Sequence, residues 1–189
     1  LDLSLYSDIR VVRFVRDPRD LVVSGYFYHQ RGAEHWCELP DPTDLDWLMV
    51  NGRVPAALPA GESLTRWLNS VSLEEGLHAE LDFRQYHFDS MRAWPTDDPR
   101  VRVFRYEDIL GNEPRVFREI LAFLELPWLA RLRGGLAARR YRAANRRGRS
   151  VHIRNPESAQ WRRYFTPELT RAFRERYGDV LERYGYPLD

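Results

Sequence analysis

Lysine is absent from this sequence, and all 29 basic residues are arginine. Any contact with a phosphate that requires a cation must therefore use arginine. The preference for arginine over lysine is typical of a GC-rich bacterial genome. Basic and acidic residues nearly cancel, which leaves a formal net charge of +1. The chain as a whole thus carries no field that would attract nucleic acid or an anionic membrane.

Cys37 is the only cysteine, which excludes an internal disulfide and a metal site built from several cysteines. A single thiol agrees with a reducing compartment, so we expect a cytoplasmic protein. No stretch approaches the roughly 18 apolar residues that span a bilayer. The sequence also lacks the Gly-x-x-x-x-Gly-Lys-Ser/Thr motif that cradles phosphates in many nucleotide-binding proteins.

The 189 residues are 43% hydrophobic, which is enough for one domain with a substantial core. Proline and glycine, with scattered tryptophan and leucine, predict a long loop over residues 33–62. Hydrophobic periodicity predicts two strands, over residues 9–15 and 101–108. It also predicts helices over residues 18–31, 63–71, 83–94, 116–124, 128–144 and 167–184. Residues 73–77 are predicted to continue the helix of residues 63–71 after a break near Ser72. Strand-to-helix units near both ends predict a parallel α/β sheet flanked by helices.

The most informative segment runs from residue 9 to residue 26. Its β-branched start predicts a buried strand, and Asp17-Pro18 predicts the cap and first position of a helix. Free N–H groups and the helix dipole favour an anion at such a junction. Arg16 adds a planar cationic fork that suits phosphate, and Ser24 offers a hydroxyl two turns into the helix. Alone, the same residues are also typical of a solvated turn with surface ion pairs.

Arg16-Asp17-Pro18-Arg19-Asp20, followed by Ser24-Gly25-Tyr26, resembles the 3′-phosphate-binding segment of the sulfotransferases that use 3′-phosphoadenosine 5′-phosphosulfate (PAPS). A second family segment follows at Tyr106-Glu107-Asp108, where Ile109 replaces the usual leucine. Physically, a tyrosine at the end of a parallel strand can contact a purine at that sheet edge. Glu107 and Asp108 suit either an acid/base or metal site, or, as we favour, helix capping and hydrogen bonds within the fold.

The third resembling segment is Arg154 to Thr166, which is similar to Arg-Lys-Gly-x-x-Gly-x-Trp-Lys-x-x-Phe-Thr. Arg154 stands seven positions before Trp161, as the phosphate-binding arginine of the family does. Asn155, Pro156 and Ala159 replace the family's Lys, Gly and Gly, and Pro156 has no N–H to donate. The departures weaken any prediction of backbone contacts to the phosphate.

The resemblance implies a partial P-loop-type sulfotransferase fold that binds PAPS and its product 3′-phosphoadenosine 5′-phosphate (PAP) without a metal. It implies that Arg16, Ser24 and Arg154 hold the 3′-phosphate and that Tyr106 lies beside the adenine. The basic residues Arg146 and Arg147 rank second, as part of a nucleotide lid. A sulfuryl group would pass from PAPS to a hydroxyl or amine of a small-molecule, glycan or lipid acceptor.

The family's phosphosulfate loop and its usual catalytic base, a histidine or glutamate, precede the Arg-Asp-Pro segment, and nothing here matches them. We therefore expect residues 1–189 to be a single sulfotransferase domain that corresponds to about the C-terminal two-thirds of a full enzyme, and no catalytic residue is assigned. Pro167 and Arg171 depart from the dimer signature of some relatives, so the oligomeric state stays open.

Two alternatives remain. A P-loop-type nucleotide kinase shares the architecture and predicts affinity for ATP with Mg²⁺. A non-catalytic module would bind PAP without turnover. A nucleic-acid-binding module fits least, because the charge is balanced. The aromatic residues 26–28 indicate core packing or an acceptor pocket about equally.

Overall fold

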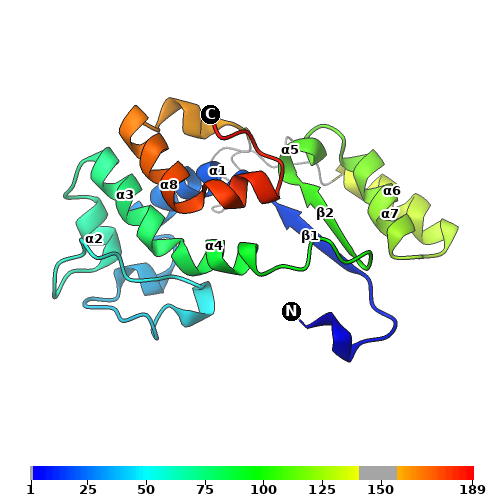
Figure 1. The fold of residues 1–189 in the computed structure, drawn as a ribbon, viewed down its shortest axis with the longest axis horizontal. Helices are drawn as coiled ribbons and strands as arrows, with labels where there is room; N and C mark the ends of the chain where they lie inside the picture. The colour runs from blue at the N-terminus through cyan, green and yellow to red at the C-terminus, as the bar shows by residue number, and fades with distance from the viewer. Residues whose placement is uncertain (1, 141–156) are drawn as a thin grey trace. The chain divides into compact units, whose positions relative to one another are not determined.

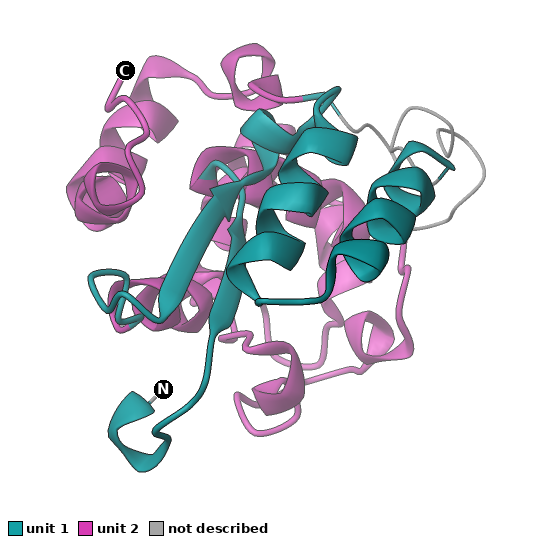
Figure 2. Ribbon diagram, turned by 90° about the vertical axis from the view of Figure 1, so that its right-hand side faces the viewer, with its two compact units in different colours: residues 1–17, 94–157 teal, residues 18–93, 158–189 magenta. Residues whose placement is uncertain are grey.

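A computed structural model describes residues 2–140 and 157–189 of the chain. The chain divides into two compact units, coloured separately in Figure 2. Unit 1 comprises Leu1–Asp17 and Trp94–Glu157, and unit 2 comprises Pro18–Ala93 and Ser158–Asp189. The first junction falls between Asp17 and Pro18, inside the segment that the sequence marks as an anion site.

Unit 1 holds the two described strands, which form one parallel pair (Figure 1). The register sets Val11 opposite Val101 and Val15 opposite Arg105. The predicted parallel α/β architecture is therefore confirmed. The elements of unit 1 are η1 (Leu3–Leu5), β1 (Val11–Val15), β2 (Val101–Arg105), α5 (Tyr106–Ile109), α6 (Glu113–Phe123) and α7 (Trp128–Arg140).

The core of unit 1 forms where α5 and α6 cover the strands. The buried side chains of Ile109, Val116 and Ile120 pack with those of Val12 and Phe104. Both strands therefore contribute to this core, and their carboxyl ends are fixed beside α5. This packing positions the residues that follow each strand.

The regular elements among the described residues of unit 2 are all helices. Unit 2 contains α1 (Pro18–Gln30), η2 (His35–Glu38), η3 (Leu48–Val50), α2 (Leu64–Leu68), α3 (Leu73–Phe83), α4 (Gln85–Arg92), η5 (Gln160–Arg163) and α8 (Pro167–Arg183). Side-chain hydroxyls cap three of these helices: Ser63 caps α2, Ser72 caps α3 and Thr166 caps α8. Each accepts a hydrogen bond from an N–H that would otherwise lack a helical partner.

The core of unit 2 brings together apolar side chains from α1, α2, α3, α4 and α8. They include Val22, Val23, Leu64, Leu68, Leu77, Leu81, Phe88, Leu169, Phe173 and Leu181. Helices α1 and α3 approach closely at Gly76, where an added Cβ would lie 2.3 Å from the Tyr26 ring. Tyr26 is buried in this contact, so the first residue of the aromatic stripe belongs to the core.

The predicted loop over residues 33–62 is irregular apart from the short turns η2 and η3. It is nevertheless anchored, because Cys37 and Trp47 are buried and Trp36 stacks on Phe83 at 5.6 Å between ring centroids. Burial raises the pKa of the Cys37 thiol to about 12, so the thiol stays protonated and unreactive at neutral pH. In the described residues, no helix is both long and apolar enough to cross a membrane.

Several predicted boundaries are wrong. Residues 83–94 do not form one helix: Phe83 is the last residue of α3, and α4 begins at Gln85. The capping box of Ser72 and Glu75 starts a helix that nothing in its sequence interrupts before Phe83.

The ends of two other elements also differ from the prediction. The second strand stops at Arg105, because Tyr106 starts the helical turn α5 and accepts a hydrogen bond from Leu110 N–H. Helix α6 starts at Glu113 rather than at Val116, since Pro114 fits its first turn. Helix α7 begins at Trp128 as predicted, and residues 141–144 lie outside the described residues.

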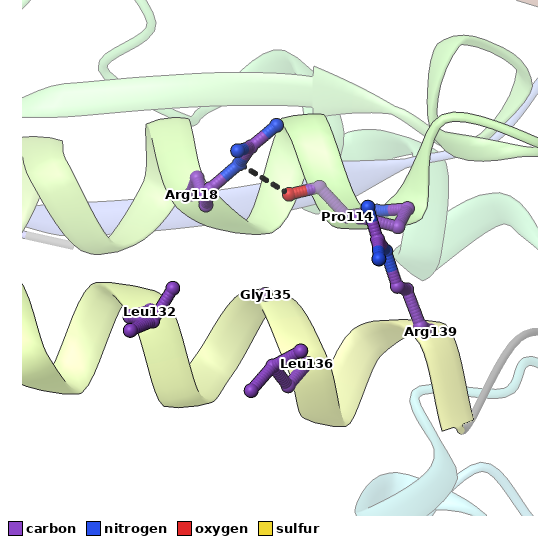
Figure 3. A pocket seen from close by; sticks show the side chains of 6 residues that line it. All are labelled: Pro114, Arg118, Leu132, Gly135, Leu136 and Arg139. Carbon is purple, nitrogen blue, oxygen red and sulfur yellow. Dashed lines mark hydrogen bonds between the residues drawn. The ribbon is translucent and has the colours of Figure 1, made fainter.

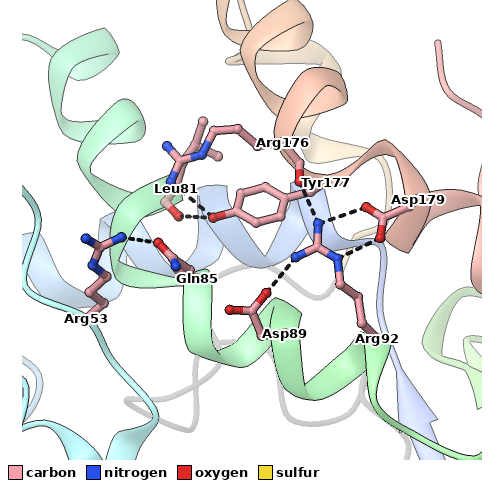
Figure 4. Close-up of polar contacts among 8 residues, drawn as sticks. All are labelled: Arg53, Leu81, Gln85, Asp89, Arg92, Arg176, Tyr177 and Asp179. Atoms are coloured by element: carbon pink, nitrogen blue, oxygen red, sulfur yellow. Dashed lines mark hydrogen bonds and ion pairs between the residues drawn. The ribbon is translucent and has the colours of Figure 1, made fainter.

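Arg92 joins α4 to α8 within unit 2 (Figure 4). Its guanidinium donates hydrogen bonds to both carboxylate oxygens of Asp179, at 2.6 and 2.8 Å, and to the carbonyl oxygen of Arg176, at 2.6 Å. These bonds from Arg92 hold the pKa of Asp179 below its usual range. Nearby, the Tyr177 hydroxyl donates to the carbonyl oxygen of Leu81 at 2.9 Å.

We expect Arg92→Ala to lower the free energy of unfolding by about 1 kcal/mol at neutral pH. A carboxylate with a lowered pKa stabilises the fold above its ordinary pKa, and this contribution disappears as the pH falls through the folded pKa. The difference between variant and parent should therefore shrink below about pH 4. Urea unfolding at several pH values measures this difference in the free energy of unfolding. Arg66→Ala is the control, because Arg66 is largely exposed in its ion pair with Glu62. A pH-independent difference would contradict this role.

Candidate functional site

The candidate site in unit 1 lies at the carboxyl ends of β1 and β2. The register pairs Val15 with Arg105 at the end of the ladder, so Arg16 and Tyr106 follow the two strands at the same sheet edge. Parallel sheets bind ligands at this edge, because loops and helix starts converge there. The structure thus brings together two residues that belong to different motifs and lie 90 positions apart in the sequence.

Arg16 and Tyr106 are in direct contact. The Arg16 guanidinium carbon lies 5.0 Å from the centroid of the Tyr106 ring, and Arg16 Nη2 donates to the carbonyl oxygen of Glu157 at 2.9 Å. Both side chains are partly exposed. A guanidinium that lies against an aromatic face can still donate from the edge of its plane, which is the geometry that a phosphate requires.

Glu107 fixes the backbone next to Arg16. Its Oε1 accepts a hydrogen bond from Asp17 N–H at 2.9 Å. The neighbouring carboxylate of Asp108 is instead paired with Arg105 at 2.8 Å. The two carboxylates therefore have different partners, which favours the prediction that they serve the fold over an acid/base or metal pair. The hydrogen bond from Asp17 to Glu107 spans 90 positions, and the sequence alone did not predict it.

Unit 2 holds the other half of the Arg-Asp-Pro-Arg-Asp segment. Arg19 and Asp20, in the first turn of α1, are each only 1% exposed. Asp20 Oδ1 accepts a hydrogen bond from Trp161 N–H at 2.9 Å, and the Arg19 guanidinium carbon lies 3.8 Å from the centroid of the Trp161 ring. The first and third family segments therefore meet within this unit, in a contact that sequence reasoning missed although both segments were recognised.

The remaining predicted site residues divide into two groups. Ser24 lies in the middle of α1 in unit 2 and is partly buried. Arg146, Arg147 and Arg154 lie outside the described residues. Their assignment to the 3′-phosphate therefore stays a prediction from the sequence.

A comparison with known protein families supports the resemblance of these motifs. The family model of the sulfotransferase domain matches residues 3–185. Among solved structures, the crystal structure of mouse sulfotransferase SULT7A1 complexed with PAP is similar, with 19% sequence identity and a TM-score of 0.48. The match covers 91% of this chain and 58% of that chain, so the chain spans little more than half of that protein's length. No curated protein matches the sequence.

Proposed function

The chain belongs to the sulfotransferase domain family, and from this we propose that the protein transfers a sulfuryl group from PAPS to an acceptor and releases PAP. The observation that carries the proposal is the contact between Arg16 and Tyr106 where the two parallel strands end. This contact places a permanently charged side chain that is suited to binding phosphate against an aromatic ring, at the edge where α/β sheets bind nucleotides.

In this proposal the residues of unit 1 bind the nucleotide end of PAPS. Arg16 donates from the edge of its guanidinium to the 3′-phosphate, and Tyr106 holds that guanidinium in place and borders the adenine. Glu107 holds the backbone immediately after Arg16, so it acts as a positioning residue. The family resemblance implies Ser24 and Arg154 as further ligands of the 3′-phosphate, and this assignment stays a prediction from the sequence.

The chemistry proposed for the whole protein is a single displacement at sulfur. An acceptor oxygen or nitrogen forms a bond to sulfur while the bond from sulfur to the bridging phosphate oxygen breaks; a base takes the acceptor proton, and PAP leaves with the bonding electron pair. The residues of this chain contribute binding and orientation, which supply much of the rate in such transfers. The acceptor is a small molecule, glycan or lipid with a hydroxyl or amine, and we place the reaction in the cytoplasm.

Calorimetric titration with PAP, adenosine 5′-monophosphate and ATP with Mg²⁺ tests the nucleotide site. We expect PAP to bind about fiftyfold more tightly than the monophosphate, because only PAP presents a 3′-phosphate to Arg16. Equal affinity for the two would contradict a 3′-phosphate site, and a preference for ATP with Mg²⁺ would indicate a kinase.

A second measurement separates catalysis from binding alone. The full-length protein is incubated with PAPS and a mixture of phenolic, sugar and lipid acceptors, and the release of PAP is followed by chromatography. Release that depends on an acceptor supports the transferase. Tight PAP binding without release in any acceptor mixture would instead identify a non-catalytic PAP-binding module.

A further inference from the structure

Helix α7 in unit 1 turns its smallest residues inward, toward α6. A Cβ added at Gly134 would lie 2.2 Å from Leu121 Cδ1, and one at Gly135 would lie 3.2 Å from Arg118 Cγ. Ala138 on the same face is buried. The close packing of the two helices depends on these small side chains, because interiors leave no room for added atoms.

The large apolar residues of α7 are exposed, although small residues of the same helix pack against α6. Trp128, Leu129, Leu132 and Leu136 are 68%, 50%, 53% and 58% exposed. At about 100° per residue, these four positions fall within an arc of about 100° on the helix. Because apolar residues on a surface helix normally face the core, this inverted arrangement marks an interaction surface. We call these four side chains the α7 outer face.

Arginines accompany the α7 outer face. Helix α7 contains four arginines and no acidic residue, although the whole chain has a net charge of only +1. By the same helical geometry, Arg139 lies within the apolar arc, and Arg133 and Arg140 lie just beyond its edge at Leu129. All three are exposed. The surface is therefore both apolar and strongly cationic.

A shallow groove of about 120 Å³ lies between α6 and α7 beside this face (Figure 3). Leu132 and Leu136 line it together with Arg118 of α6 and Arg139 of α7. The Arg118 Nε donates to the Pro114 carbonyl oxygen at 3.1 Å, which fixes the base of that guanidinium. Cations and leucines thus share one opening, which suits an anion attached to a hydrocarbon chain.

We propose that the α7 outer face docks on the surface of an anionic lipid bilayer. Its leucines enter the headgroup boundary, Trp128 occupies the interface, and the arginine stems lie along the apolar surface while their guanidinium groups bind lipid phosphates. Charge complementarity favours anionic lipid, and the apolar arc disfavours nucleic acid. A fluid bilayer surface adapts to the exposed side chains of α7 and to the groove beside them, so it needs no preformed complementary shape. The proposal is independent of sulfuryl transfer.

Flotation of the protein with vesicles tests this docking. The vesicles contain phosphatidylcholine alone or phosphatidylcholine with phosphatidylserine. We expect binding only to the anionic vesicles and its loss in high salt. The double variants Leu132→Gln/Leu136→Gln and Arg133→Gln/Arg139→Gln should each weaken binding by about tenfold. Leu45→Gln/Leu48→Gln, at exposed leucines of unit 2, is the matched control and should bind like the parent.

The alternatives give different results. Absence of binding to anionic vesicles, or equal weakening by the control variant, would overturn the proposal. A dimer in size-exclusion chromatography that the leucine variant converts to a monomer would identify a second copy of the chain as the occupant instead. Salt-sensitive binding to DNA or RNA, with an affinity that the leucine variant leaves unchanged, would identify a nucleic-acid surface. Thermal unfolding of the variants, all at exposed positions, confirms that they fold.

Discussion

Replacing Glu80 with glutamine is expected to lower the free energy of unfolding of the protein by about 3 kcal/mol. Glu80 is 2% exposed, and its carboxylate contacts the side chains of His29 and Arg84 in unit 2. Its Oε2 lies 2.8 Å from Nδ1 of His29, and its Oε1 accepts a hydrogen bond from Nε of Arg84 at 2.8 Å. The variant removes the charge that compensates a partly buried guanidinium, which is why the cost exceeds that of a surface pair.

The packing around Glu80 leaves little room for relaxation. An added Cβ at Gly25 would lie 2.0 Å from Glu80 Oε1, so the carboxylate occupies space that only a glycine on α1 allows. His29 is itself held by aromatic neighbours, with the Phe83 ring centroid at 4.4 Å. A glutamine keeps the shape of the side chain, so the expected loss reports charge and hydrogen bonding rather than a cavity.

Denaturant unfolding of the parent and of Glu80→Gln measures the effect. Glu62→Gln is the control, because Glu62 makes a longer ion pair, at 3.6 Å, with a largely exposed Arg66, and we expect a change below about 0.5 kcal/mol. If Glu80→Gln changed stability no more than this control, the buried carboxylate would not hold α1 and α3 together.

The sequence predicted the elements that local chemistry determines. The β-branched run before Arg16 forms β1, Pro18 starts α1, and the Thr166-Pro167 pair starts α8. Each has its signal within a few residues, so neighbouring chain segments could not override it. The family resemblance then located the motifs of Arg16 and Tyr106, and the structure places these two side chains in contact, which the sequence did not predict.

Contacts between distant segments were beyond such reasoning. Asp20 receives the Trp161 N–H across 141 positions, and no local pattern specifies that pairing. The turn at Tyr106 was also missed, because alternating residues continue past Arg105 while the strand pairing ends there. For α7, an apolar pattern predicted a helix correctly but not that its largest side chains would face outward, since periodicity does not say which face meets α6.

Replacing Arg16 with alanine is expected to weaken the binding of PAP by about fiftyfold, because a charged, planar donor to the 3′-phosphate is lost. Arg102→Ala is the matched control: Arg102 is an exposed arginine of the adjacent strand β2 and should leave PAP affinity within about twofold of the parent. Calorimetric titration of both variants measures the affinities.

The affinity for adenosine 5′-monophosphate shows whether Arg16 binds the 3′-phosphate or only supports the structure. If Arg16 binds the 3′-phosphate, Arg16→Ala should reduce PAP affinity to near that of the monophosphate and leave monophosphate affinity unchanged. Arg16 also contacts the Tyr106 ring and the Glu157 carbonyl oxygen, so a purely structural role would weaken both nucleotides equally and lower the melting temperature. Arg16→Lys keeps the charge but loses the planar fork, and should therefore recover only part of the PAP affinity. Full recovery by lysine would show that charge alone matters at this position.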